Sequence, residues 1–183
     1  MRYDAKKITL KDGRKCILRS PLESDAAEML RMRIRAAGES DFLMRYPEEF
    51  NDYPLDAQIK FISNTIESED ILMLTAFVDG KLAGNCSISF NNSIKTRHRG
   101  EIGVGILKEY WGLGIGSAFF EELINTATNR NGITQLELDV FDKNERAIAL
   151  YKKFGFEIVG TIPEAIRLKD GTMMGVHTMI KKL

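Results

Sequence analysis

Three Asp-Gly pairs separate short runs in which apolar residues alternate with polar ones or stand together: Asp12-Gly13, Asp79-Gly80 and Asp170-Gly171. Asp and Gly both tolerate the positive φ angles of a two-residue hairpin turn. The pattern therefore predicts three antiparallel hairpins. They pair residues 7–10 with 14–19, residues 71–78 with 81–90, and residues 158–168 with 172–181.

Four stretches outside these hairpins carry apolar residues at the spacing of an amphipathic helix. They cover residues 24–37, 55–66, 115–128 and 144–154. Asn144 stands at the expected N-cap of the last helix, because a side-chain oxygen there can accept a hydrogen bond from the first turn. Gly132 and Gly155 follow the last two helices, as glycines commonly do at helix C-termini.

Two more strands, 100–107 and 135–140, flank the helix at 115–128. The first is Gly-rich but otherwise Ile, Val and Leu, and the second alternates polar with apolar residues. A strand–helix–strand unit of this kind joins parallel strands by a right-handed crossover. The predicted order is β-β-α-α-β-β-β-α-β-α-β-β. The fold class is therefore α+β, with a mixed, mostly antiparallel central sheet flanked by helices.

Composition and charge exclude several functional classes. The 183 residues fit one domain, and the chain is long enough to bury a core. Because 26 Lys and Arg balance 26 Asp and Glu, we expect no electrostatic binding of nucleic acid or of an anionic membrane. No apolar run approaches the ~20 residues of a membrane span, and the first residues do not resemble a signal peptide. The expected location is the cytoplasm.

Cysteine and histidine usage adds little chemistry. Cys16 and Cys86 lie far apart in strand-like surroundings, so we expect buried free thiols. His98 and His177 lack the spacing of metal ligands, and no metal site is expected. The charge is uneven, however. Residues 36–70 hold nine acidic residues against Arg45 and Lys60, a net charge of −7.

Residues 110–117, Tyr-Trp-Gly-Leu-Gly-Ile-Gly-Ser, join the strand at 100–107 to the helix at 115–128. Alternate glycines let a ligand approach the backbone, and the helix N-terminus offers N–H groups and the positive end of its dipole. The segment therefore predicts a phosphate cradle. A P-loop is excluded because no lysine follows Gly116. One alternative is that the segment is only a tight strand-to-helix connection that binds no ligand. A second alternative is a dinucleotide-binding loop, with Asp139 as the acidic residue that follows it, although the Gly-x-Gly-x-x-Gly spacing of such loops is not matched.

A second motif follows in the helix at 144–154. It reads Asn-x-x-Ala-x-x-Leu-Tyr-x-x-x-Gly-Phe from Asn144 to Phe156, and it places Asn144 and Tyr151 two turns apart on one helix face. Together with the strand at 101–107 and the glycine loop, it resembles the GNAT superfamily of acyl-CoA-dependent N-acetyltransferases. The resemblance covers residues 71–183 and implies a GNAT-like fold.

The resemblance implies a role for individual residues. The backbone N–H groups of the loop would hold the pyrophosphate of acetyl-CoA, and the end of the preceding strand would pair with the pantetheine arm. The loop residues are Gly112, Leu113, Gly114, Ile115, Gly116 and Ser117, and the strand residues are Val104, Ile106 and Leu107. Trp111 replaces the Gln or Arg that opens the family's loop, which leaves backbone binding intact.

The same resemblance implies the catalytic groups. Tyr151 would give a proton to the departing CoA thiolate, and Asn144 would contact the cofactor arm as well as cap its helix. Glu101 stands where some members carry the general base. The alternative for Glu101 is a surface carboxylate beside Arg99.

The implied activity is transfer of an acetyl group from acetyl-CoA to a small-molecule or peptide amine, by direct attack in a ternary complex. Residues 14–70 would form the acceptor side and residues 71–183 the acetyl-CoA-binding core of one domain, 1–183. If the acidic segment 36–70 lines the acceptor pocket, its carboxylates favour a cationic amine; the alternative is a solvated charged face. A silent CoA-binding sensor and a dinucleotide-binding protein are the other hypotheses. The family also includes homodimers.

Overall fold

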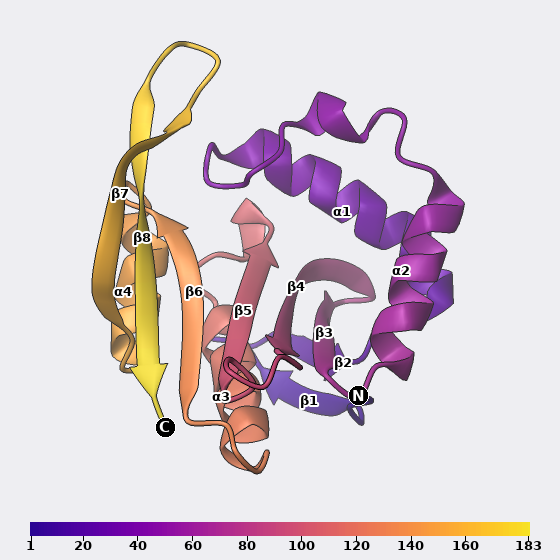
Figure 1. Cartoon of the computed structure of the whole chain (residues 1–183). Coiled ribbons are helices and arrows are strands. Elements are labelled where there is room, and N and C mark those ends of the chain that lie inside the picture. Colours follow the sequence, from indigo (N-terminus) through magenta and orange to yellow (C-terminus); the bar gives the residue numbers. More distant parts are fainter. The chain divides into compact units, whose positions relative to one another are not determined.

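Figure 1 shows the computed structural model of the protein, which describes all 183 residues. The helices and strands follow the predicted order. The strands are β1 (Lys6–Thr9), β2 (Lys15–Arg19), β3 (Ile71–Val78), β4 (Lys81–Phe90), β5 (Arg99–Ile106), β6 (Gln135–Phe141), β7 (Glu157–Arg167) and β8 (Met173–Lys182). The helices are α1 (Ala26–Glu39), α2 (Leu55–Glu67), α3 (Ile115–Thr128) and α4 (Glu145–Lys153).

All three predicted hairpins form. Strands β1 and β2, β3 and β4, and β7 and β8 pair antiparallel. At the turn between β3 and β4, Asp79 and Gly80 have φ angles of 50° and 76°, in the left-handed region that Asp and Gly tolerate. The structure adds three short 3₁₀ helices: η1 (Glu23–Asp25), η2 (Pro47–Phe50) and η3 (Lys108–Tyr110). Segments of three or four residues are too short to show a hydrophobic period, so the sequence did not predict them.

Contacts divide the chain into two compact units. Unit 1 comprises Met1–Ser89 and Gly103–Leu123, and unit 2 comprises Phe90–Ile102 and Ile124–Leu183. Strand β5 and helix α3 contribute residues to both. The division follows contacts within the fold. It does not test the functional boundary expected near residue 70, which stays a prediction.

In unit 1 the strands follow the order β1-β2-β3-β4-β5. Helices α1 and α2 pack against each other, and α2 contacts β3 (Figure 1). The core contains fully buried side chains from the strands and from α3, among them Leu18, Leu74, Ile88, Phe119 and Phe120. Burying one such side chain stabilises the fold by roughly 1.5–3 kcal/mol relative to its exposure. The thiols of Cys16 and Cys86 are free and buried, as expected.

Gly84 in β4 lets two strands approach closely. A Cβ atom at this position would lie 2.6 Å from the carbonyl oxygen of Gly105 and 3.0 Å from Cα of Ile106, both in β5. Real Cβ atoms do not come that close to backbone, so only glycine fits here without a shift of the strands. The residues around this contact, Asn85 and Gly105, also line the cavity described below.

In unit 2 the strands follow the order β5-β6-β8-β7. Strands β5 and β6 run parallel, as the strand–helix–strand pattern predicts, while β6–β8 and β7–β8 are antiparallel. The parallel ladder covers Arg99–Glu101 of β5 and Gln135–Glu137 of β6. Leu136, Phe156 and Met179 are fully buried. A mixed, mostly antiparallel sheet is not the doubly wound parallel sheet of a dinucleotide-binding fold, so the structure excludes that fold.

Candidate functional site

The glycine loop lies in unit 1, between η3 and the first turn of α3. Gly112 and Gly114 have φ angles of 80° and 104°, which residues with a Cβ rarely adopt. The N–H of Ala118 donates to the Gly114 carbonyl at 3.0 Å, so the helical hydrogen bonds begin at Gly114. The N–H groups of Ile115 and Gly116 precede that bond and have no acceptor within the helix. The backbone thus has the form expected of an anion cradle.

Two hydrogen bonds fix this loop. The indole Nε1 of Trp111 donates to the carbonyl oxygen of Ile106 at 2.7 Å, and the N–H of Lys11 donates to the carbonyl of Leu113 at 3.0 Å. Trp111 therefore ties the start of the loop to the end of β5. In place of the polar side chain that the family pattern has here, this chain has a residue that orients the loop. The sequence did not indicate this role.

The end of β5 has backbone groups with different partners. Leu107 donates its N–H to the Ala83 carbonyl in β4 at 2.9 Å. Because backbone groups alternate along a strand, those of Val104 and Ile106 point away from β4. The carbonyl of Ile106 is occupied by Trp111. Of the three strand residues predicted to pair with pantetheine, Val104 has both backbone groups on that edge, Ile106 retains its N–H there, and Leu107 contributes none.

Asn144 and Tyr151 lie in unit 2. The Asn144 side chain caps α4 by accepting a hydrogen bond from the N–H of Ala147 at 3.2 Å, which confirms its predicted capping role. Tyr151 is 6% exposed, and its ring centroid lies 6.4 Å from that of Phe156. Burial raises the pKa of the Tyr151 hydroxyl to about 12, because the ionised phenolate would be poorly solvated. At neutral pH the hydroxyl therefore keeps its proton and can donate it.

Glu101, the candidate general base, is exposed on β5 in unit 2. Its neighbour Arg99 donates through Nε to Glu137 at 2.8 Å, in the strand alongside. Glu101 pairs in register with that same Glu137. The exposed position of Glu101 is compatible with the alternative of a surface carboxylate, while the ion pair of Arg99 is with Glu137. The role of Glu101 stays a prediction.

A cavity of about 370 Å³ lies in unit 1, against the carboxyl half of β5. Its walls come from α1, α2, the segment between them, and strands β3 to β5. The lining residues are Met29, Met32, Arg33, Ala36, Ala37, Leu43, Met44, Arg45, Phe50, Gln58, Phe61, Met73, Asn85, Ser87, Gly103, Val104 and Gly105. Val104 is thus common to the cavity and to the predicted acetyl-CoA strand. The other walls belong to no motif in the sequence.

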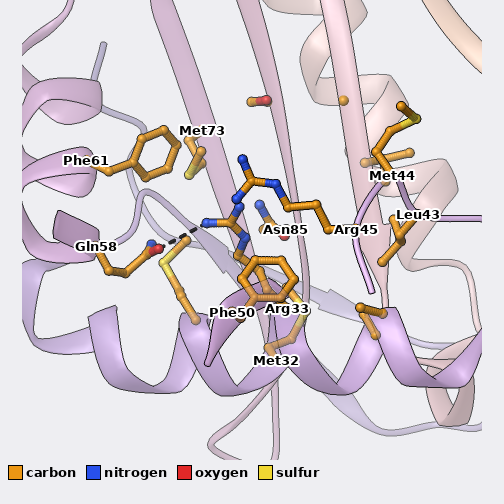
Figure 2. A pocket seen from close by; sticks show the side chains of 17 residues that line it. Met32, Arg33, Leu43, Met44, Arg45, Phe50, Gln58, Phe61, Met73 and Asn85 are labelled. Atoms are coloured by element: carbon orange, nitrogen blue, oxygen red, sulfur yellow. Dashed lines mark hydrogen bonds between the residues drawn. The ribbon is translucent and has the colours of Figure 1, made fainter. Parts of the chain in front are cut away.

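Two guanidinium groups enter this mostly apolar cavity. Figure 2 shows the side chains of Arg33, from α1, and Arg45, from the following segment, turned toward the same part of the pocket. Arg33 lies 5.2 Å and Arg45 5.8 Å from the centroid of the Phe50 ring, within cation–π range. Arg33 Nη1 donates to Oε1 of Gln58 at 3.1 Å. The cavity is therefore positively charged.

The acidic residues of segment 36–70 lie outside the lining of this cavity, and their role in attracting a cationic amine stays a prediction. The segment supplies lining residues, but none of its nine acidic side chains is among them. Glu39 instead accepts from the Lys108 N–H at 2.6 Å and from Arg35 at 2.8 Å, and Glu49 accepts from the Tyr46 N–H at 2.7 Å. Acidic side chains in this segment thus cap turns and tie elements together, while Arg45 faces the cavity.

Comparison with known proteins identifies the family. A model described as "Acetyltransferase (GNAT) family" matches residues 36–156, about two thirds of the chain. The chain belongs to the GNAT acetyltransferase family. This GNAT protein is 31% identical over 111 residues to the L-amino acid N-acetyltransferase AaaT of Escherichia coli K12, a match that covers 61% of this chain and 68% of AaaT. The matched region spans 59% to 68% of the length of three such relatives.

Solved structures agree with the fold. A GNAT-family acetyltransferase from Streptococcus pneumoniae superposes with a TM-score of 0.85 and 29% identity, over 92% of this chain and 99% of that one. The yncA protein of Salmonella typhimurium, a putative acetyltransferase solved with its cofactor acetyl-CoA, has a TM-score of 0.75 and 18% identity, over 91% and 92% of the two chains. The predicted fold class is confirmed. The yncA likeness concerns the fold alone.

Two further observations concern ligands and membranes. Nowhere in the structure do three or more His, Cys, Asp or Glu side chains come together as a ligand set for a metal ion. The longest helices, α1 and α3, have 14 residues each, and none combines the length and apolar character of a membrane span.

Proposed function

We propose that this GNAT protein is an N-acetyltransferase that moves an acetyl group from acetyl-CoA to an amine, a small molecule or a peptide, by direct attack in a ternary complex. The amine nitrogen attacks the thioester carbonyl, a C–N bond forms and the C–S bond breaks. The amine loses a proton to a base, and the departing CoA thiolate gains one. Holding both substrates in one orientation can supply roughly 7–11 kcal/mol of the barrier reduction.

The observation that carries this proposal is the backbone of the glycine loop. Gly112 and Gly114 adopt left-handed φ angles directly before the N-terminus of α3, in a chain that belongs to the GNAT family. Helix N-termini of this form bind phosphate through their N–H groups and dipole. We assign the CoA pyrophosphate to residues 112–117, and the pantetheine arm to the backbone groups of Val104 and the N–H of Ile106. The arm would pair there like an added strand.

The catalytic roles follow the family resemblance. Tyr151 would protonate the CoA thiolate; its pKa of about 12 supports this role, because the hydroxyl stays protonated throughout the working pH range. Asn144 would contact the cofactor arm. Glu101 or a water molecule would accept the amine proton. A positioned acid or base of this kind typically contributes 10²–10⁴-fold to the rate.

Calorimetric titration with acetyl-CoA, with NADH as the control, tests the cofactor assignment. Micromolar binding of acetyl-CoA and none of NADH is expected. Amine-dependent release of free CoA thiol then tests the reaction. Burial raises the pKa of the Cys16 thiol to about 11, so the protein's own cysteines will react little with the thiol reagent near pH 8. Acetyl-CoA binding without turnover of any amine would instead indicate a CoA-binding sensor.

Replacing Tyr151 with Phe tests the proton donor. We expect kcat to fall by about 10²-fold or more while the Kd for acetyl-CoA stays the same, because the departing thiolate loses its proton donor. With a Tyr151 pKa of about 12, the natural protein should show no loss of rate between pH 7 and 10 from ionisation of this group. Tyr53→Phe is the matched control, since it removes a hydroxyl but keeps the ring beside Arg33. An unchanged kcat in Tyr151→Phe would exclude the role.

A further inference from the structure

We infer that the cavity in unit 1 selects an acceptor amine that also carries a carboxylate, namely a free amino acid with an apolar side chain, whose carboxylate is held by Arg45 and Arg33 with help from Gln58. The inference rests on the proposed transferase function and names its substrate class. It differs from the expectation of a cationic acceptor, which rested on the acidic residues of segment 36–70.

The two arginines have no counterion in the protein. Neither guanidinium forms a salt bridge: the polar contact of Arg33 is the amide of Gln58, and Arg45 contacts the Phe50 ring. Elsewhere in unit 1, Arg14, Arg19 and Arg35 each pair with a carboxylate. Two unpaired cations that point into one cavity repel each other and attract an anion. A guanidinium binds a carboxylate through two parallel hydrogen bonds, so this anion fits best.

Gln58 provides an independent sign of a missing acceptor. Its side chain is completely buried in the cavity wall, and its Nε2 has no hydrogen-bond partner. The orientation of the amide is fixed by chemistry: Arg33 can only donate, so Oε1 must face Arg33 and the NH₂ group must point elsewhere. Buried amide donors in folded proteins are almost always paired. A carboxylate oxygen bound beside Arg33 would satisfy this one.

The rest of the cavity fits an apolar side chain. Met29, Met32, Met73 and Phe50 are buried, and Phe61 and Leu43 add apolar surface at its edge. The volume of about 370 Å³ lies near the lower end of the ~300–1,000 Å³ typical of ligand pockets, which suits a molecule of amino-acid size. Methionine side chains adapt to several ligand shapes, so we expect selectivity for apolar side chains as a class.

The cavity lies beside the strand that we assign to the pantetheine arm, as transfer of the acetyl group to a bound amine requires. Gly103, Val104 and Gly105 of β5 form one wall, and Val104 is the residue whose backbone we assign to the pantetheine arm. An amino acid whose carboxylate lies against Arg45 and Arg33 therefore lies in the same cavity as the strand that would present the thioester. The arginines and Gln58 then act as specificity residues that orient the amine without taking part in the proton transfers.

Three amines with the same apolar body separate the possibilities: L-leucine, its neutral amide L-leucinamide, and 3-methylbutylamine, which has no carbonyl group. With acetyl-CoA and the full chain, we expect kcat/KM for L-leucine to exceed those of the other two by about 100-fold. Because the amide is the less basic amine, it offers more unprotonated nitrogen near pH 8. Amine reactivity alone would therefore favour the amide, and preference for L-leucine reports the carboxylate.

The variants Arg45→Gln and Arg33→Gln assign the effect to the cavity. Each should raise KM for L-leucine by about tenfold or more with little change in kcat, and should leave L-leucinamide and the Kd for acetyl-CoA unchanged. Arg31→Gln is the matched control, because Arg31 lies exposed on the same helix and does not line the cavity. The melting temperature of each variant shows whether the fold is retained.

Different results would contradict the inferred substrate class and the proposed transferase function. Equal turnover of the three amines, an equal loss of both activities in Arg45→Gln, or faster acetylation of a Leu-Ala-Ala peptide than of L-leucine would overturn the inference and leave the transferase function in place. If acetyl-CoA binds but no amine is acetylated, the transferase function fails. Titration of L-leucine into the CoA-loaded protein then decides the inference: binding that Arg45→Gln abolishes supports it, and no binding overturns it.

Discussion

The glycine loop and the cavity of unit 1, the two proposed binding sites, differ in the groups that they offer to a ligand. The loop occupies the consecutive residues 110–117, and it offers backbone N–H groups in a conformation that the positive φ angles of Gly112 and Gly114 define. The cavity gathers side chains from six separate segments between Met29 and Gly105, and its chemistry comes from two guanidinium groups and one amide. A backbone site leaves a contiguous motif in the sequence. A side-chain site appears only when the fold brings its parts together.

Reversing a charge in the cavity should have the largest effect. We expect Arg45→Glu to lower kcat/KM for L-leucine by about 10²–10³-fold, since a like charge placed beside the substrate carboxylate costs several kcal/mol. Acetyl-CoA affinity should not change, because the loop contributes through its backbone. Steady-state kinetics and calorimetry measure the two quantities. Arg31→Glu introduces the same charge on the exposed side of α1. A loss no larger than in that control would show that the side chains of the cavity do not set specificity.

The difference between the two regions also explains which features of the structure could be predicted from the sequence. The order of strands and helices, the three hairpins and the single parallel pair β5–β6 were all predicted, and β3, β4 and α3 have the predicted bounds. Each depends on local signals such as Asp79-Gly80 or the period of α3. The glycine loop was found for the same reason, since its residues are adjacent and its helix follows at once.

The cavity could not be predicted from the same signals. The net charge of −7 in residues 36–70 left two alternatives, an acceptor pocket that favours a cationic amine and a solvated charged face, because a sum of charges does not say where each side chain points. Glu39 bonds to Lys108 and Arg35, and Glu49 bonds to the Tyr46 backbone, while Arg45, an exposed basic residue of this segment, lines the cavity. Arg33 and Gln58 lie on different helices, 25 residues apart, and no motif links them.

Gly84 tests whether backbone geometry also matters at the cavity. Its missing Cβ lets β4 and β5 approach beside Asn85 and Gly105, so Gly84→Ala forces an atom to within 2.6 Å of the Gly105 carbonyl. Overpacking of this kind typically costs about 1–3 kcal/mol, which corresponds to a fall in melting temperature of roughly 2–10 °C for a chain of this size. Gly160→Ala is the control, because a Cβ there meets nothing within 4 Å. If both variants melt together, the close approach of β4 and β5 is not required.

The smallest expected effect, in Gly114→Ala, is the sharpest test of the loop. Gly114 has a φ of 104°, and a Cβ there would approach only Cγ of Lys11, at 4.0 Å, so backbone conformation is the main change. A left-handed conformation costs a residue with a Cβ roughly 1–2 kcal/mol, which is about 5- to 30-fold in acetyl-CoA affinity if the loop must hold this conformation to bind pyrophosphate. Gly132→Ala imposes a similar strain at a φ of 85°, with nothing within 4 Å, outside the loop. Calorimetry and melting temperature on both variants separate binding from stability. The loop itself offers no charged side chain. An unchanged Kd in Gly114→Ala would therefore mean that side chains outside the loop hold the cofactor, and the loop and the cavity would no longer differ in how they bind.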